Sequence, residues 1–169
     1  MKPAVADINA LCLYRISDQK GRINKAKDHH TLLLEWDPYD TSIMVFNQDR
    51  PTFNRFSHSP RLSESWGISP KGTWQWLQSE AELENILLDQ INGLERFLDF
   101  YRYSVLNGEG QVSEIILAGE FPNLKELGNR LKDRFMVDIK MLELPKQVDQ
   151  SFGALYGLTL KEEAGEKRL

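Results

Sequence analysis

The sequence has only one cysteine, Cys12, among its 169 residues, which excludes an internal disulfide and favours a reducing compartment. No apolar run approaches the roughly 18 residues that a membrane-spanning helix needs. The acid Asp7 comes too early for the apolar region of a secretory signal. Positive charge is also scarce: 21 Lys and Arg against 25 Asp and Glu leave a net charge of −4, which argues against a dedicated nucleic-acid-binding protein. We therefore expect a soluble, cytoplasmic protein.

Several common catalytic motifs are missing as well. The sequence contains no Gly-x-x-x-x-Gly-Lys-Ser/Thr phosphate loop, no Cys-x-x-Cys pair and no Gly-x-Ser-x-Gly nucleophile turn. What is present is a hydrophobic fraction of 41%, which is enough for a buried core. The length suits one domain, which we place at residues 1–160, followed by a charged, frayed tail at residues 161–169.

The first part of the chain predicts three antiparallel strands. Residues 31–36 are a short apolar run typical of a strand buried on both faces, and residues 42–47 and 52–57 follow after turns. Parallel neighbours would need a crossover of a dozen or more residues, so these strands must be antiparallel. Before them we expect a short strand at residues 2–6 and a helix at residues 9–17.

The second part predicts helices that alternate with strands. Ser79 and Glu82 form a capping box, and apolar residues then recur every three or four positions as far as Val105, which predicts one long helix. Further along we expect a strand at residues 114–118, a helix at 123–131, a strand at 137–142 and a helix at 151–160. The order β-β-β-α-β-α-β-α predicts an α/β fold, a mixed five-stranded sheet with helices on both faces. It is the element order of the ribonuclease-H-like fold, which actin-like ATPases repeat.

The segment at residues 58–78 is rich in proline, glycine and tryptophan, and we expect it to be irregular. Trp74 and Trp76 are two positions apart, so they would share one face of a strand. Together with Trp66 they suit two interpretations. They are anchors for a protein partner, because aromatic side chains dominate interface energetics, or they cover the edge of the sheet. The sequence leaves both open.

Histidine and cysteine offer weak candidate sites. His29 and His30 are adjacent, so in a strand they point to opposite faces and cannot easily share a metal ion. We expect both of them, and His58, at the surface, and we expect no metal site. Cys12 lies in an apolar pattern with no histidine at a motif spacing, which predicts a buried, inert thiol.

A local basic cluster lies in the polar stretch that follows the first helix. Such a cluster could touch the anionic inner face of the cytoplasmic membrane, but an ordinary solvated loop is the favoured interpretation. Its members are Lys20, Arg22, Lys25 and Lys27.

Several stretches resemble the second half of the PilM family of type IV pilus assembly proteins. Residues 3–15 resemble its strand and helix, residues 33–55 its phosphate-loop hairpin, and residues 94–103 its long helix. Residues 114–127 and 152–160 resemble its adenosine-side strand and its closing helix. The resemblance covers most of the chain, but only the C-terminal half of the family. It implies an actin-like fold and a role in assembling type IV pili or the competence pseudopilus.

The nucleotide motifs of that family are eroded here. Its first phosphate loop typically reads Asp-x-Gly with a nearby threonine, whereas this chain retains only the acids Glu35 and Asp37 and Thr41. Pro38 has no N–H to offer a phosphate, and Trp36 is bulky.

The second motif of the family carries consecutive glycines after its strand. In this chain, Gly119 is instead followed by Glu120. The resemblance thus implies a vestigial cofactor site made of Glu35, Asp37, Thr41 and Gly119, with ATP binding lost and no cofactor.

Two classes of function remain open. The leading hypothesis is a non-catalytic PilM-like scaffold, a pseudo-ATPase that acts by contact with protein partners of a pilus or competence complex and that could form homo-oligomers because one lobe is missing. The alternative is a residual enzyme: an ATPase completed by another chain, or a metal-dependent nuclease. The nuclease would use Glu35 or Asp37 together with Glu120, and Glu82 or Glu84 from the long helix.

Overall fold

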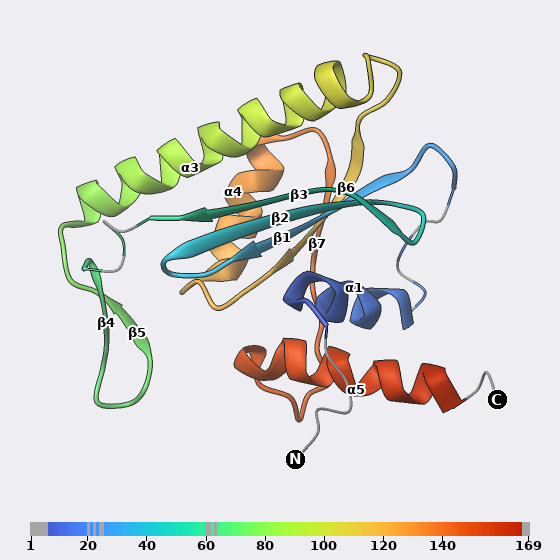
Figure 1. Cartoon of the computed structure of the whole chain (residues 1–169). Helices are drawn as coiled ribbons and strands as arrows, with labels where there is room; N and C mark the ends of the chain where they lie inside the picture. Colours follow the sequence, from blue (N-terminus) through green and yellow to red (C-terminus); the bar gives the residue numbers. More distant parts are fainter. Residues whose placement is uncertain are drawn as a thin grey trace.

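A mixed five-stranded sheet forms the centre of the protein (Figure 1). The computed structural model describes residues 7–19, 21, 23, 26–59, 62 and 64–166, so the strand expected at residues 2–6 lies outside the described residues. The strand order is β3-β2-β1-β6-β7. The strands are β1 (His30–Trp36), β2 (Asp40–Asn47), β3 (Arg50–His58), β6 (Val112–Ala118) and β7 (Asp138–Met141).

The pairing directions follow from the lengths of the connections. β1, β2 and β3 are antiparallel, as the short turns between them require. β6 lies parallel to β1, with Glu35 opposite Ala118, and β7 lies parallel to β6. The predicted mixed sheet is confirmed. Because β1 and β6 run the same way, both end at the same edge of the sheet.

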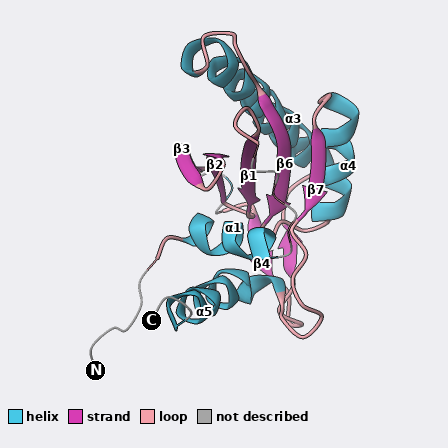
Figure 2. Ribbon diagram, turned by 90° about the vertical axis from the view of Figure 1, so that its right-hand side faces the viewer, coloured by secondary structure: helices cyan, strands magenta, loops and turns pink. Residues whose placement is uncertain are grey.

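Helices cover both faces of the sheet (Figure 2). α3 (Glu80–Phe100) and α4 (Leu124–Arg134) lie on one face, and α1 (Asn9–Gln19) and α5 (Gly153–Glu166) lie on the other. Side chains along a strand alternate between these layers. In β1, Leu32 and Leu34 join the core beneath α3, whereas Leu33 joins the core beneath α1. All three are fully buried, which explains why the sequence of β1 is an uninterrupted apolar run.

The long helix begins as predicted, with the Ser79 side chain accepting a hydrogen bond from the Glu82 N–H. Its apolar face buries Leu87, Ile91, Leu94 and Phe97 against the sheet. After Phe100 the helix widens into a π-helical turn, Tyr101–Val105, which the sequence periodicity did not reveal.

Tyr101 is completely buried at the start of that turn. Its hydroxyl lies 3.0 Å from His30 Nδ1 and 3.0 Å from Thr52 Oγ1, so it links β1, β3 and the end of α3. The expectation that His30 lies at the surface was therefore wrong, since it is 7% exposed and burial lowers the pKa of its imidazole. His29 lies 3.2 Å from Glu114 Oε1, and only His58 is largely exposed.

Two further segments differ from the sequence prediction. Residues 58–78, expected to be irregular, contain a small hairpin of β4 (Trp66–Ile68) and β5 (Trp74–Trp76). α5 runs to Glu166, so the frayed tail expected from Lys161 does not begin there. The charged composition of that stretch hid the continuation of the helix.

α1 and α5 pack unusually closely. A Cβ atom at Gly157 of α5 would lie 2.1 Å from the carbonyl oxygen of Cys12 in α1, so only glycine permits this contact. The backbone carbonyl of Gly157 also accepts a hydrogen bond of 2.7 Å from Arg15. Cys12 is buried in this contact, as predicted, and burial raises the pKa of its thiol.

Two glycine-to-alanine substitutions should therefore have opposite effects on stability. Alanine gains about 1 kcal/mol over glycine in a helix. We expect Gly93→Ala in α3, where the nearest atom to the new Cβ is 3.9 Å away, to raise the free energy of unfolding by about 0.5–1 kcal/mol. Gly157→Ala should lower it by about 1–3 kcal/mol, because α1 and α5 must move apart. Urea denaturation of both variants measures this. An increase in stability for Gly157→Ala would show that the two helices are not held this closely.

Candidate functional site

A small cavity lies at the edge of the sheet where β1 and β6 end. Its volume is about 180 Å³. α1 contributes Asn9, the end of β1 contributes Glu35 and Asp37, and the turn after β6 contributes Gly119 and Glu120. The start of α5 closes the opposite side. The carboxyl end of parallel strands is where open α/β sheets usually bind ligands, so this cavity is the candidate site of the fold.

Gly119 shapes this edge by a close approach to β1. Its φ angle is +116°, and a Cβ atom there would lie 2.2 Å from the carbonyl oxygen of Trp36. That carbonyl accepts a hydrogen bond of 3.1 Å from the Phe121 N–H, which holds the chain leaving β6 against the end of β1. Glycine is thus required here by backbone geometry, whether or not a ligand binds.

Asp37 accepts a hydrogen bond from a backbone N–H group at this edge of the sheet, that of Glu120. Asp37 Oδ1 lies 2.7 Å from this nitrogen. Burial raises the pKa of Asp37 above its usual range, and this hydrogen bond opposes the rise because it favours the charged form. Backbone N–H groups in such turns are the usual donors to phosphate. Here the donor is already bound by a carboxylate of the chain itself.

Glu35 is the most strongly perturbed acid of the cavity. Burial raises its pKa to about 7, and the nearby charge of Asp37 adds to the effect. The Asn9 side-chain amide donates a hydrogen bond to Glu35 Oε1 and partly opposes the rise. Glu35 therefore carries a carboxyl group that changes charge near neutral pH.

Thr41, the fourth residue of the predicted site, does not join the other three. It faces the α3 side of the sheet, whereas Glu35, Asp37 and Gly119 line the cavity on the edge near α1. The Trp36 ring lies on the same side, buried under α3 with its centroid 6.3 Å from that of Phe121, so it does not enter the cavity. Alternation of side chains along the strands explains both positions.

The additional acids considered for a nuclease lie elsewhere. Glu84 forms an ion pair of 2.7 Å with Arg130 of α4, and Glu82 lies in the first turn of α3. Neither lines the cavity at the end of β1. Within the described part of the chain, no group of three or more His, Cys, Asp or Glu side chains is arranged to hold a metal ion.

The tryptophans make contacts within the molecule. Trp66 is 6% exposed, with its ring centroid 5.7 Å from Phe121 and 5.1 Å from Trp76. Trp74 packs edge-on against Tyr39 at 5.2 Å, and Trp76 Nε1 donates a 2.9 Å hydrogen bond to the Ser79 carbonyl. These contacts favour the interpretation in which the rings cover the sheet.

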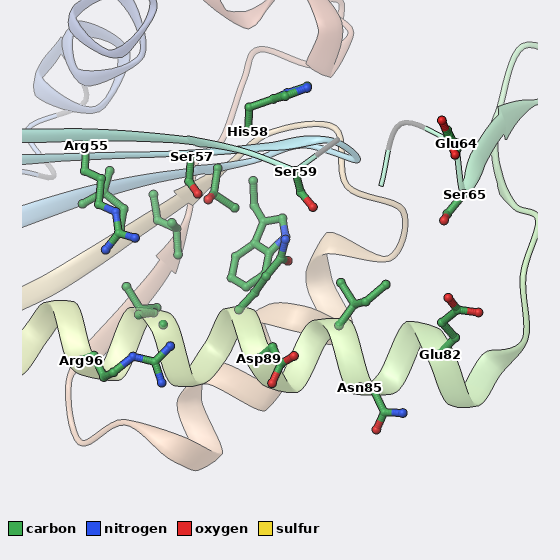
Figure 3. Close-up of a pocket in the computed structure, with 18 of the residues that line it drawn as sticks. Arg55, Ser57, His58, Ser59, Glu64, Ser65, Glu82, Asn85, Asp89 and Arg96 are labelled. Atoms are coloured by element: carbon green, nitrogen blue, oxygen red, sulfur yellow. The ribbon is translucent and has the colours of Figure 1, made fainter. Parts of the chain in front are cut away.

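A larger cavity, of about 800 Å³, lies between β3 and α3 (Figure 3). Sequence reasoning missed it, because its walls come from positions far apart in the chain. The only signals were a glycine, Gly93, inside a long helix and an arginine, Arg55, on the inward-facing register of β3. The close-up shows Arg55 and Arg96 at one end of this space and Glu82 and Glu64 at the other.

The basic cluster is only partly placed. Lys20, Arg22 and Lys25 lie outside the described residues. Lys27 is exposed, and its backbone carbonyl accepts a 2.9 Å hydrogen bond from Asn47. No helix among the described residues has the length and apolar character needed to cross a bilayer.

Comparison with known proteins gives structural matches only. No family model and no curated protein matches the sequence. Among solved structures, the chain is similar to a protein of the PilM-PilN type IV pilus biogenesis complex, at 18% identity and a TM-score of 0.63 over 95% of this chain and 53% of that one. It is also similar to Ta0583, an archaeal actin homolog, at 14% identity and a TM-score of 0.55, covering 91% of this chain and 54% of the other.

A third similar structure, the Alp12 filament, has 7% identity and a TM-score of 0.58 over 94% of this chain and 53% of that chain. Together these matches show an actin-like ATPase fold, in agreement with the sheet and helix order described above. The chain spans about half the length of these structures.

The raised pKa of Glu35 predicts a pH-dependent penalty on stability. From its ordinary pKa of 4.5 up to about 7, the folded state binds more protons at this group than the unfolded state. The free energy of unfolding should therefore fall as the pH rises through this window. Between pH 5 and 8 we expect the wild type to lose about 1–2 kcal/mol more than Glu35→Gln, allowing for solvent screening.

Urea titrations at each pH measure this difference, and Glu109→Gln, at an exposed turn position, controls for net charge. Parallel curves for the wild type and Glu35→Gln would contradict the raised pKa.

Proposed function

We propose that this chain is a non-catalytic scaffold, an actin-like pseudo-ATPase that acts by protein–protein contact in the assembly of a type IV pilus or competence pseudopilus. The observation that carries the proposal is the hydrogen bond between Asp37 and the Glu120 N–H. A phosphate group would have to displace a carboxylate that is covalently part of the chain. The chain therefore keeps the sheet of the fold, but the Glu120 N–H at the carboxyl end of β6 is hydrogen-bonded to a side chain of the chain itself.

The size and charge of the cavity support the same conclusion. Small-molecule sites usually measure about 300–1,000 Å³, whereas this cavity holds about 180 Å³. Three carboxyl groups, those of Glu35, Asp37 and Glu120, line it. In their ionised forms they would repel the phosphates of ATP, and this repulsion should grow as the pH rises through the pKa of about 7 at Glu35.

The pilus assignment draws on the similarity to the PilM-PilN structure and on the resemblance of sequence segments to the PilM family. The partners we propose are proteins of such a complex, on the cytoplasmic side or at the inner face of the cytoplasmic membrane, with further copies of this chain as a second possibility. In the similar structures, roughly the other half of each chain has no counterpart among these residues.

A residual enzyme is the second candidate. The observation that favours it is the pKa of about 7 at Glu35, since a general base works best with a pKa near the operating pH. Such an enzyme would be an ATPase completed by another chain or a metal-dependent nuclease. Either enzyme would need the carboxylates of Glu35, Asp37 and Glu120 to bind a metal ion or substrate, whereas Asp37 is hydrogen-bonded to the Glu120 N–H.

Titration with Mg-ATP separates the two functions. A ligand that binds only the folded state stabilises it by about 2.7 kcal/mol at a hundred times its Kd. We expect neither heat in calorimetry nor a shift in melting temperature at 1 mM nucleotide, roughly that hundredfold excess for a Kd of about 10 µM. Saturable micromolar binding that Glu35→Gln or Glu120→Gln alters would overturn the scaffold proposal in favour of the enzyme.

Complementation in the native host tests the biological role. We expect deletion of the gene to abolish surface pili or DNA uptake. A double variant, Glu35→Gln with Glu120→Gln, should restore the phenotype fully, because both side chains are isosteric with the originals and a scaffold needs no acid there. Normal piliation and uptake after deletion would refute the pilus assignment. Restoration by the wild type but not by the double variant, at equal protein level, would favour the enzyme.

A further inference from the structure

Two neighbouring cavities lie between the outer strand β3 and the helix α3, and we call them together the groove. The cavity of about 800 Å³ lies beside a second one of about 170 Å³, and both are lined by Arg55, Gly93 and Arg96. The shared residues place the two cavities next to each other along the strand. Its floor is apolar, with Leu34 and Ile43 beneath it. Figure 3 shows the larger part, between the strands and the helix.

β3 offers an unpaired backbone along this groove. It is the last strand of the sheet, paired only with β2, and it is 9 residues long. An outer strand presents a row of free N–H and C=O groups to any extended chain that comes alongside. Proline and an irregular register usually protect such edges. Here Pro51 and the register shift at Thr52 lie only at the beginning of β3, so residues 53–58 remain open among the described residues.

Two arginines of the groove, Arg55 and Arg96, line both cavities. Within the described residues, neither Arg55 nor Arg96 forms an ion pair or a side-chain hydrogen bond, whereas Arg130 and Arg134, also on the helical layer, both pair with acids of α3. The smaller cavity has no acid among the described residues that line it, so this end of the groove favours an acidic group of a ligand.

An aromatic pocket adjoins these arginines. The Phe53 ring lies 5.3 Å from that of Phe97 and 5.8 Å from that of Phe100, measured between centroids. Phe100 is 44% exposed, so the pocket is open to solvent on one side. Phe53 and Arg55 are two positions apart on β3 and point to the same face, so a neighbouring strand would meet them with two side chains that are also two positions apart.

We propose that the groove binds an extended, acidic peptide segment of a partner protein, which adds a strand to β3. An Asp or Glu side chain of the peptide meets Arg55 and Arg96, and an aromatic side chain two positions away enters the Phe53–Phe97–Phe100 pocket. Backbone hydrogen bonds to β3 supply affinity, and the two side chains supply specificity, as in other cases of strand addition. This inference rests on the proposed scaffold role, because it names a surface through which that role is exerted.

A second copy of this chain fits the groove poorly. β3 contains Arg50 and Arg55 and no acid, so pairing of β3 with its own copy would bring like charges together. The acids of the groove add a second constraint: Asp89 lies midway along it, and Glu64 and Glu82 lie at the end away from the arginines (Figure 3). They favour a peptide that is acidic at the arginine end and neutral or basic at the other.

Selection from a displayed library of random dodecapeptides tests the proposal, with the full chain as bait. Gly93→Leu serves as the counter-bait, since a Cβ atom at Gly93 has its nearest neighbour 3.9 Å away and a leucine there fills the groove without disturbing the helix. We expect enriched peptides to carry an acid and an aromatic residue two positions apart. Their affinity, measured by fluorescence anisotropy, should fall at least tenfold in Arg55→Glu and in Arg96→Glu.

Matched controls keep the result interpretable. Lys125→Glu makes the same change in charge at an exposed position of α4 and should leave the affinity unchanged. Gly93→Ala, which adds only a methyl group, should remain folded and retain most of the binding. Hydrogen exchange should show new protection of β3 amides when the peptide binds.

Three results would overturn the proposal. They are a selection without enrichment, peptides that bind all variants equally, and protection confined to a surface other than β3. Concentration-dependent dimerisation abolished by Arg55→Glu would assign the groove to a second copy, which also overturns the peptide proposal. All measurements use the purified chain without nucleotide. Failure of the groove proposal therefore leaves the ATP and complementation results standing, and a positive ATP titration leaves the peptide result standing.

Discussion

The parallel pairing of β1 with β6 is the constraint on which the rest of the molecule depends. Both strands are buried on both faces, and their register brings Glu35 opposite Ala118. This pairing fixes the candidate site, because the two chain exits at one edge bring Asp37 within hydrogen-bond distance of the Glu120 N–H. The same pairing also determines where the groove lies. Because β6 and β7 lie on one side of β1, the antiparallel strands β2 and β3 extend on the other side, and β3 is the edge strand next to the groove.

Most of the sheet and its helices could be predicted from the sequence, because their signals are local. The apolar run at residues 31–36 and the cap at Ser79 each require only neighbouring residues to be interpreted. The elements that were missed depend on distant contacts. β4 and β5 form a hairpin in which Trp66 packs on Phe121 and Trp74 packs on Tyr39. The π-helical turn begins at Tyr101, whose hydroxyl contacts His30 and Thr52.

The candidate site was predictable in composition but not in geometry. Resemblance to a family identified Glu35, Asp37 and Gly119, which the structure brings together around one cavity. Thr41 was grouped with them because it is close in sequence, but a turn and a change of strand place it beneath α3. The hydrogen bond from the Glu120 N–H to Asp37 joins two segments that are far apart in the sequence, so no local pattern could reveal it. The groove was invisible for the same reason, since a strand and a helix far apart in sequence form its walls.

The contact between α1 and α5 determines when the protein can finish folding. Gly157 touches Cys12, although the two residues lie near opposite ends of the chain. The face of the sheet beneath α3 and α4 is complete once β7 has been synthesised, but the other face also needs α5, which follows β7 in the chain. During translation, Leu33, Ile116 and their neighbours must therefore stay partly uncovered until α5 has left the ribosome.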